Sequence, residues 1–267
     1  MPVKRYLRQR FFPQLWCAGC GHGQIMASLI RAIEELGLQK NNVVVVSGIG
    51  CSSRMPGYLD FHTLHTLHGR ALAFATGVKM GRPELNVIVP MGDGDASAIG
   101  GNHLIHAARR NINITAIVMN NNIYGMTGGQ SSPTTPVAAK STTAPLGNID
   151  PAFDLVELAK GAGASFVARS TTYHSKEMQN MFVKAINHKG FSFVEVLTQC
   201  PTYYGRKNEG VSPTEMMKKF ATTTTSIGSP KKKENPELIE RGVFVDQERT
   251  EYASSYCEMI NQMRKQK

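Results

Sequence analysis

The feature that most restricts the fold is a regular alternation of apolar runs and amphipathic stretches over the first 200 residues. Five runs rich in β-branched residues are predicted as strands: Val43–Val46, Val87–Val89, Thr115–Met119, Ser165–Ala168 and Phe191–Leu197. Five amphipathic stretches of helical length lie between or before them: Gln24–Leu36, Arg70–Met80, Ile99–Arg110, Ala152–Lys160 and Lys176–His188. This alternation predicts an α/β fold, in which helices cover both faces of a doubly wound, mostly parallel sheet.

Two segments interrupt the alternation. Residues 125–148, GMTGGQSSPTTPVAAKSTTAPLGN, are too long for an ordinary connection, and such loops are usually functional or disordered. After Cys200 the sequence reads as a turn-rich link, PTYYGRKNEG, then a mobile polar stretch, ATTTTSIGSPKKKENP, then a terminal helix at Thr250–Arg264. We therefore expect a core domain at residues 1–206 and a small C-terminal extension at 207–267 that contacts another subunit.

Composition narrows the classes of function. The chain has 267 residues and a net charge of +10, but its Lys and Arg are scattered and do not alternate with aromatics on one element, which argues against nucleic-acid binding. A docking face for an acidic protein, or an ordinary solvated surface, explains the charge equally well. No apolar run reaches the length of a membrane span, and no signal-peptide pattern follows the basic N-terminus. We expect a cytoplasmic protein.

Acidic and amide side chains follow two of the predicted strands. GDGD, residues 92–95, comes after one, and Asn120, Asn121 and Asn122 end the next. Neighbouring strand ends lie about 5 Å apart at the carboxyl edge of a parallel sheet, where ligands bind. Asp93 and one Asn could share a Mg²⁺ whose other ligands include a diphosphate, and the glycines Gly92 and Gly94 would let it approach the backbone. An incidental acid pair in a plain strand-to-helix turn is the alternative.

The cysteines suggest a second centre. Cys17 and Cys20 form a Cys-x-x-Cys pair, Cys51 follows the first strand, Cys200 ends the last, and Cys257 lies in the terminal helix. An odd count without an export signal argues against disulfides and favours a metal or redox site. Four thiolates suit either a [4Fe–4S] cluster or Zn²⁺, and the dispersed spacing leaves both open.

These motifs together resemble a known family. WCAGCGHG, SGIGCSSR, LHGRALAFATGVK, the GDGD stretch, NNNIYGMTGGQSSPT and QCPTYYG are similar, in that order, to the β subunit of 2-oxoacid:ferredoxin oxidoreductases. The resemblance covers residues 16–206. It implies thiamine diphosphate with Mg²⁺ held by Asp93, Asn121 and the backbone oxygen of Ile123. It also implies a [4Fe–4S] cluster on Cys17, Cys20, Cys51 and Cys200, whereas Cys257 reads as a small apolar residue.

The same resemblance implies which residues surround the cofactor. The expected set is Ile49, Gly50, Cys51, Ser52, His68, Gly69, Gly92, Gly94, Asp95, Gly125 and Met126. His62 and His65 share the threefold spacing of His68 but are not expected at the site. Residues 128–135, GGQSSPTT, are expected to form part of the substrate mouth. No catalytic residue is assigned to this chain, because the glutamate that drives ylide formation in thiamine enzymes has no counterpart in it.

The implied activity is the coenzyme A-dependent oxidative decarboxylation of a 2-oxoacid. Electrons would pass through the cluster to ferredoxin or flavodoxin, and an α subunit would supply the missing glutamate in an obligate α2β2 heterotetramer. TGGQSSPTT and CPTYYGR look most like the 2-oxoglutarate enzymes, although no basic residue lies between Gly125 and Lys140 to bind a distal carboxylate. Pyruvate and branched-chain or aromatic oxoacids are the alternative substrates. A non-redox thiamine decarboxylase or synthase half and a zinc-stabilised binding module are the alternative classes.

Overall fold

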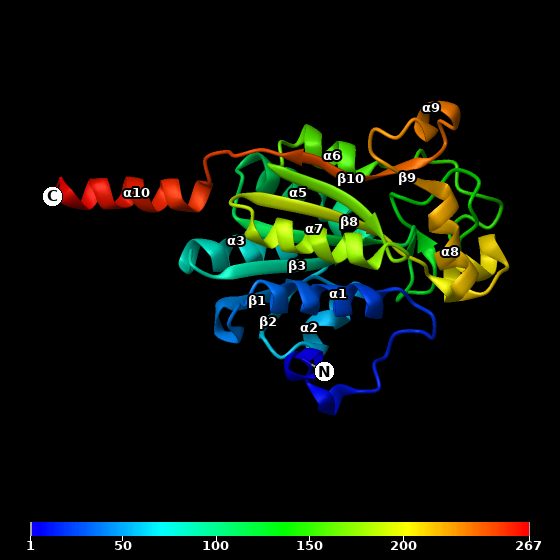
Figure 1. Ribbon diagram of the computed structural model, residues 1–267, viewed down its shortest axis with the longest axis horizontal. Helices are drawn as coiled ribbons and strands as arrows, with labels where there is room; N and C mark the ends of the chain where they lie inside the picture. The colour runs from blue at the N-terminus through cyan, green and yellow to red at the C-terminus, as the bar shows by residue number, and fades with distance from the viewer. Residues whose placement is uncertain (1, 267) are drawn as a thin grey trace.

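An eight-stranded sheet forms the central layer of the protein, in a computed structural model that describes residues 2–266 (Figure 1). Its strand order is β2-β1-β3-β4-β8-β7-β10-β9. The strands are β1 Val43–Ser47, β2 His62–His65, β3 Asn86–Gly92, β4 Ile114–Asn120, β7 Phe166–Thr171, β8 Phe191–Leu197, β9 Thr224–Ser226 and β10 Ile239–Asp246. Neighbours are parallel except β10, which runs antiparallel to β7. A separate small hairpin pairs β5 Ile123–Tyr124 with β6 Gln130–Ser131.

Helices connect and cover the strands. They are α1 His22–Glu35, α2 Met55–Tyr58, α3 Ala71–Gly81, α4 Asp93–Ser97, α5 Gly101–Arg109, α6 Leu155–Gly161, α7 Ser175–Asn187, α8 Pro213–Thr223, α9 Lys231–Glu234 and α10 Tyr252–Lys265. Short 3₁₀ turns occupy Pro2–Tyr6, Gln9–Phe11, Lys40–Asn42 and Ser52–Arg54, and a π-helix, η5, occupies Pro201–Glu209. None of the helices in the described residues is both long and apolar enough to cross a bilayer.

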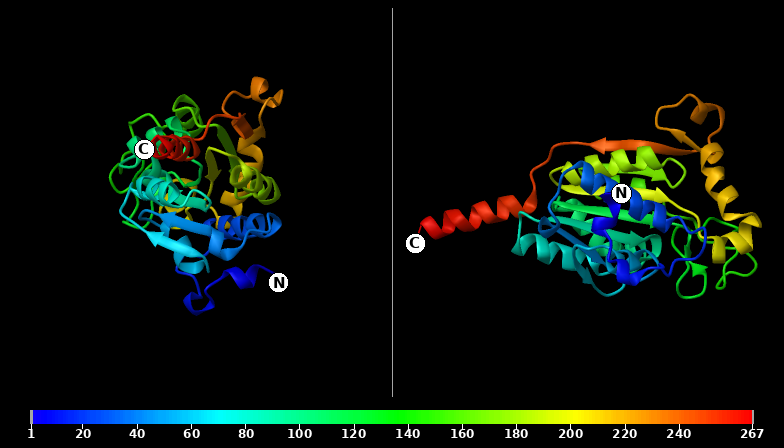
Figure 2. Two further views of the ribbon diagram at one scale, coloured as in Figure 1. Left: turned by 90° about the vertical axis from the view of Figure 1, so that its left-hand side faces the viewer. Right: turned by 60° about the horizontal axis from the view of Figure 1, so that its bottom comes forward.

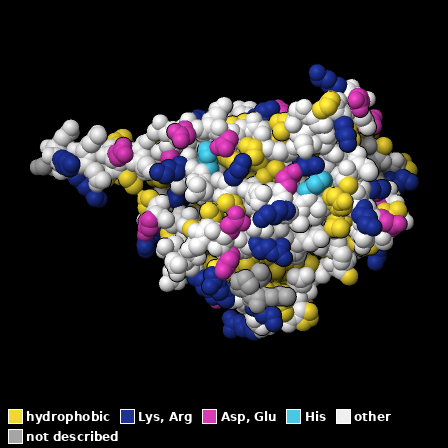
Figure 3. Space-filling view, in the orientation of Figure 1, with side chains coloured by type: hydrophobic (Ala, Val, Ile, Leu, Met, Phe, Trp, Pro, Cys, Tyr) yellow, Lys and Arg dark blue, Asp and Glu magenta, His cyan; other side chains and the backbone are white. Residues whose placement is uncertain are grey.

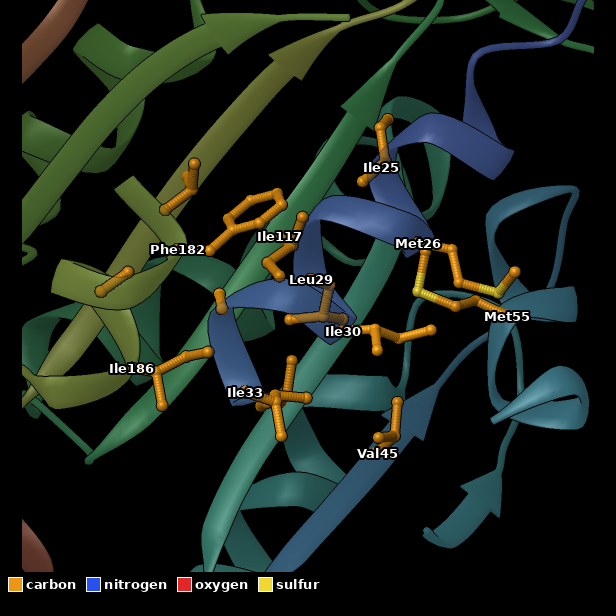
Figure 4. Packing of buried hydrophobic residues seen from close by; sticks show 14 of the residues in the cluster. Ile25, Met26, Leu29, Ile30, Ile33, Val45, Met55, Ile117, Phe182 and Ile186 are labelled. Atoms are coloured by element: carbon orange, nitrogen blue, oxygen red, sulfur yellow. The ribbon is translucent and has the colours of Figure 1, made fainter. Parts of the chain in front are cut away.

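The two faces of the sheet bury two separate cores. Successive strand residues point to opposite faces, so Val43 and Val45 pack under α1, α2 and α7, and Val44 and Val46 pack under α3, α5 and α6. Figure 4 shows the first core, where apolar residues of α1 and α7 meet the sheet. Each fully buried aliphatic side chain contributes roughly 1.5–3 kcal/mol. This layering confirms the predicted doubly wound fold.

The five predicted strands and five predicted helices are all present, with small changes at their ends. Within the part of the main sheet that precedes Cys200, one strand was missed. β2, whose His62 and His65 were considered only for their spacing, pairs in parallel with β1 at the edge of the sheet. Its two histidines are exposed, so it lacks the continuous apolar run that made the other strands recognisable.

The predictions of a turn-rich link and a polar stretch after Cys200 were wrong. The link is the π-helix η5, and α8 follows it from a capping box in which Ser212 and Glu215 bond each other's backbone N–H groups. The polar stretch contributes its first residues to α8, and its Thr224 and Thr225 lie in β9, since β-branched residues favour strands. β10 then pairs with β7 and joins the extension to the main sheet. The division of the chain at residue 206 stays a prediction.

The carboxyl ends of the parallel strands meet at one edge of the sheet. Loops after β1, β3, β4 and β8 gather there, beside η5 and α8 (Figure 1). At the opposite end, α10 extends away from the body of the molecule (Figure 2), and Ala253 is its only buried residue within the described range. The predicted terminal helix at Thr250–Arg264 is thus confirmed within two residues.

Candidate functional site

A cavity of about 300 Å³ opens at this carboxyl edge. Thirteen of the residues expected at the diphosphate and Mg²⁺ site line it: Ile49, Gly50, Cys51, Ser52, His68, Gly92, Asp93, Gly94, Asp95, Asn121, Ile123, Gly125 and Met126. Gly69 does not line it but lies behind it, donating its backbone N–H to Asp95 Oδ1 at 2.7 Å. Four lining residues were not expected: His22, Met119, Tyr124 and Thr127. We call this space the cofactor cavity.

Asp93 is the first residue of α4 and is buried. Its Oδ2 accepts hydrogen bonds from Ser132 Oγ at 2.6 Å and Thr134 Oγ1 at 2.7 Å. Burial raises the pKa of the Asp93 carboxyl, and the hydroxyls of Ser132 and Thr134 lower it in part because they bond the charged form. The arrangement fixes the carboxylate while leaving it on the wall of the cavity, as a ligand for a hard cation requires.

The three consecutive asparagines each do something different. Asn120 ends β4 and is buried, with its Nδ2 donating to Glu195 Oε1 at 2.8 Å. Asn121 lines the cavity, and its Oδ1 accepts a hydrogen bond from the backbone N–H of Ile123 at 3.3 Å. Asn122 adopts a left-handed backbone with φ of 60°, which asparagine tolerates better than most residues and which turns the chain toward Ile123. The run therefore ends a strand, presents an amide oxygen and makes a turn.

Asp95 holds two loops together below the cavity. Besides Gly69, its Oδ1 lies 2.9 Å from His68 Nδ1 and 3.4 Å from the backbone N–H of Ile49. Burial raises the pKa of the Asp95 carboxyl despite these partners. A Cβ on Gly48 would lie 2.4 Å from both carboxylate oxygens, so only glycine fits there. Oδ2 of Asp95 is buried and has no hydrogen-bond partner among the described residues.

Two glycines of the motif allow close approach of other groups. A Cβ on Gly94 would lie 2.1 Å from the ring of Tyr124, so this aromatic side chain closes over the backbone of α4. Burial raises the pKa of Tyr124 to about 12, and the nearby carboxylates of Asp93 and Asp95 add to the effect. A Cβ on Gly125 would lie 3.5 Å from Cys51 Sγ and 3.6 Å from Cys200 Sγ, so Gly125 packs against both sulfurs.

A second cavity, of about 270 Å³, adjoins the first. All four cysteines expected to bind the cluster line it: Cys17, Cys20, Cys51 and Cys200. The two cavities share Cys51, Asn121, Gly125 and Met126. Cys257 instead lies in α10, at the other end of the molecule (Figure 1). We call this second space the cysteine cavity.

The thiols of the cysteine cavity lie close enough together to affect one another's pKa. Burial raises the pKa of Cys20 to about 12 and that of Cys51 to about 11, and each is raised further by the charges of the other cysteines. Within residues 2–266, no three His, Cys, Asp or Glu side chains converge tightly enough to hold one metal ion.

A buried ion network supports the cofactor cavity from behind. Arg169 Nε donates to Glu195 Oε2 at 2.6 Å, and its other nitrogens bond Asp154, the N-cap of α6, and the Glu240 carbonyl of β10. Glu195 in turn accepts from Asn120. The network ties β4, β7, β8 and β10 together directly beneath the asparagine turn.

Sequence reasoning missed several supporting residues. Ser132 and Thr134 were expected only as part of a substrate mouth, yet their hydroxyls point at Asp93. Whether the rest of residues 128–135 contacts substrate stays a prediction. His62 and His65 line neither cavity, as expected, and His65 Nδ1 lies 3.0 Å from Ser47 Oγ. His22 lies two residues after Cys20 and was overlooked because its contact with Cys20 depends on how the chain folds.

Comparison with known proteins gives consistent matches. The family model of the thiamine pyrophosphate enzyme C-terminal TPP binding domain matches residues 48–196. The chain is 48% identical to 2-oxoglutarate synthase subunit KorB of Methanothermobacter thermautotrophicus over 264 residues, covering 98% of this chain and 92% of the relative. It is 45% identical over 188 residues to subunit beta of 2-oxoacid:ferredoxin oxidoreductase 2 of Aeropyrum pernix, covering 70% of this chain and 61% of the relative.

A solved structure matches almost the whole fold. It is a chain of the 2-oxoglutarate:ferredoxin oxidoreductase from Magnetococcus marinus, with 2-oxoglutarate, coenzyme A and succinyl-CoA bound. The TM-score is 0.89 at 32% sequence identity, and the match covers 98% of this chain and 91% of that chain.

Proposed function

The chain belongs to the KorB family, the β subunits of 2-oxoglutarate:ferredoxin oxidoreductases, and we propose that its two adjoining cavities hold thiamine diphosphate and an iron–sulfur cluster. It is a subunit of an oxidoreductase that acts on a 2-oxoacid. The single observation that carries the proposal is the shared wall of the cavities, because Cys51 lines both. A group in one cavity is thereby adjacent to a group in the other, as electron transfer between them requires.

We assign the diphosphate and its Mg²⁺ to the cofactor cavity. Asp93, Asn121 and the backbone oxygen of Ile123 would bind the cation, which supports the assignment because all three residues line the same space. When bound, thiamine diphosphate stabilises the carbanion that remains after a 2-oxoacid loses CO₂. The residues of this chain contribute binding and orientation, with Tyr124 and Gly94 narrowing the floor of the cavity.

We assign a [4Fe–4S] cluster to Cys17, Cys20, Cys51 and Cys200, with ferredoxin or flavodoxin as the electron acceptor. The GIGCSS loop lacks the third glycine of a dinucleotide motif, so a nicotinamide acceptor has no evident place. Cys17 is exposed, which would bring one edge of the cluster near the surface. On the face seen in Figure 3, Lys and Arg are spread over many elements. The charge pattern therefore supports general attraction of an acidic carrier more than one marked patch.

The substrate we propose is 2-oxoglutarate, with coenzyme A as acyl acceptor. Family membership supports this choice over pyruvate and over branched-chain or aromatic oxoacids. No basic residue lies between Gly125 and Lys140. We therefore infer that the contact to the distal carboxylate comes from outside this loop, either from His68 on the cavity wall or from a partner subunit.

The partner is an α subunit that supplies the glutamate for ylide formation. Each chain of this kind holds the diphosphate end of the cofactor, so we infer that the ring end lies against the partner. Pairing two such units gives a twofold α2β2 assembly as the simplest closed form. This chain alone should then be inactive even with both cofactors restored.

The test is co-expression with an α subunit of the same enzyme family, followed by anaerobic purification. We expect a broad brown visible band from the cluster and 2-oxoglutarate- and coenzyme A-dependent reduction of ferredoxin, with slower reduction by pyruvate. Asp93→Asn should abolish retention of thiamine diphosphate, measured by calorimetry, without loss of the brown band, since Asp93 lines the cofactor cavity and not the cysteine cavity. Asp60→Asn, at an exposed carboxylate paired with Lys40, is the control. Cofactor binding by Asp93→Asn at the wild-type level would contradict the assignment.

A further inference from the structure

His22 lies in the wall between the two cavities. Its ring lines the cofactor cavity, and it is only 1% exposed. Its Nδ1 lies 3.2 Å from the sulfur of Cys20, which lines the cysteine cavity. Among the described residues, no other histidine hydrogen-bonds a cysteine sulfur: His68 Nδ1 lies against Asp95 and Ile49, and His65 Nδ1 lies against Ser47. His22 thus contacts both sites at once.

The position of the His22 ring is fixed by its neighbours. His22 begins α1, and a Cβ on the preceding Gly21 would lie 2.1 Å from Thr198 Oγ1, so the backbone there packs closely against the end of β8. The ring of Trp16 lies 5.8 Å away between centroids, and Trp16 Nε1 donates to the backbone oxygen of Cys51 at 2.7 Å. Trp16 therefore contacts the imidazole of His22 and also the loop that carries Cys51.

The chemistry of a ligated cysteine decides the direction of this hydrogen bond. A sulfur bound to iron is a thiolate, which has no proton to donate and can only accept. The atom 3.2 Å from it must then carry hydrogen, so Nδ1 is the protonated nitrogen of His22. Hydrogen bonds to cluster sulfurs are among the features that set cluster potential. Reduction adds one negative charge that the sulfurs share, so a donor stabilises the reduced form more than the oxidised form.

We propose that His22 is a positioning residue that donates its Nδ1–H to the Cys20 thiolate and so raises the reduction potential of the [4Fe–4S] cluster. The inference rests on the cluster assigned in the proposed function and adds a residue that tunes it. The change is a one-electron reduction in which no covalent bond forms or breaks. Because the donor is part of the wall of the cofactor cavity, anything that moves His22 would also change the readiness of the cluster to take an electron.

The experiment compares two substitutions in the anaerobically purified complex with its partner subunit. His22→Leu removes the donor and keeps an apolar side chain, whereas His22→Asn retains an N–H near the place of Nδ1. Reductive titration with dithionite, followed by electron paramagnetic resonance, gives the midpoint potential, and iron analysis gives the cluster content. His65→Leu, at a histidine that lines neither cavity, is the matched control.

We expect His22→Leu to keep its iron and to lower the reduction equilibrium constant about tenfold, a shift of 59 mV for a one-electron couple. His22→Asn and His65→Leu should have the iron content and midpoint potential of the wild type. If His22→Leu loses iron while His22→Asn keeps it, His22 holds Cys20 in place rather than setting the potential, and the proposal is overturned. A fully loaded His22→Leu with unchanged potential, or loss of iron from both variants, would overturn it. Wild-type complex without iron would instead refute the proposed function.

Discussion

At the scale of single residues, the site depends on hydroxyl groups that no sequence motif predicts. Thr134 Oγ1 lies 2.7 Å from Asp93 Oδ2 and 2.9 Å from Asn120 Oδ1, so one hydroxyl joins the carboxylate of one strand end to the amide of the next. Side chains that orient metal ligands are usually needed nearly as much as the ligands themselves. Thr134 therefore links the GDGD motif to the asparagine run.

Thr134→Val should weaken Mg²⁺-dependent binding of thiamine diphosphate by about 10–100-fold, since the methyl group fills the space but cannot donate to Asp93. Calorimetric titration of the cofactor into the assembled complex measures the change. Thr76→Val is the matched control, because the hydroxyl of Thr76 bonds only the backbone oxygen of Leu72 within α3. Equal affinities for the two variants would show that Thr134 does not orient the ligand.

The sequence makes the proposed Mg²⁺ ligands easier to recognise than the residues that hydrogen-bond them. Asp93 and Asn121 are recognisable because a glycine-flanked acid and an asparagine run follow two buried strands. Ser132 and Thr134 lie in a long loop rich in similar residues, and nothing in the letters SSPTT tells which hydroxyls turn inward. His22 was missed for the same reason, since its contact with Cys20 depends on how α1 meets the sheet.

At the scale of elements, burial decided what could be predicted. The strands recognised from sequence, such as β4 and β8, are buried along their whole length and read as continuous apolar runs. β10 is only half-buried, and Arg241 and Gly242 interrupt its apolar residues. Its sequence was therefore assigned to the C-terminal extension, although the strand pairs with β7. A partly exposed strand carries a weaker signal because its side chains do not form a continuous apolar run.

Among contacts between elements, we expect the buried ion network that crosses these strands to contribute strongly to the free energy of unfolding. Arg169 and Glu195 have side chains only 7% and 2% exposed. Arg169→Met should lower the free energy of unfolding by about 3–5 kcal/mol, because it leaves the Glu195 carboxylate buried without its cation. Urea denaturation followed by circular dichroism measures the loss. Adding Glu195→Gln to the same chain should restore part of it.

A surface pair provides the comparison for Arg169. Arg82 and Glu84 are bonded at 2.5 Å but are 69% and 56% exposed, so Arg82→Met should cost no more than about 1 kcal/mol. If Arg169→Met costs as little as Arg82→Met, the network is not what holds β7 and β8 beneath the asparagine turn.

At the scale of the whole molecule, the long loop at residues 125–153 resembles a surface that a partner protein covers. Residues 125–153 include just two charged side chains, Lys140 and Asp150, in a chain of net charge +10. Leu146 and Ile149 are 97% and 87% exposed. The loop is nevertheless well bonded internally, for example through the Asn148 Nδ2 bonds to the backbone oxygens of Thr135 and Asp150. Apolar side chains displayed on an ordered, weakly charged loop are typical of the centre of an interface.

This loop also leads directly to the cofactor. It begins at Gly125 on the cavity wall, and its Ser132 and Thr134 bond Asp93. A partner seated on Leu146 and Ile149 would therefore lie beside the diphosphate site, where the proposed function requires an α subunit. Leu146→Asp combined with Ile149→Asp should reduce the share of this chain that co-elutes with the α subunit, since burying two new carboxylates is unfavourable. Size-exclusion chromatography of the co-expressed pair measures that share.

The control must alter an exposed apolar residue elsewhere in the same way. Ile227→Asp is suitable because Ile227 follows β9, is 44% exposed and lines neither cavity. The brown band of the cluster should persist in both variants, which separates loss of assembly from loss of folding. If the loop variant co-elutes with the α subunit as fully as Ile227→Asp does, this loop is not the contact. The α subunit would then have to reach the cofactor cavity from the opposite side, across the Ile49 and His68 loops that Asp95 holds together.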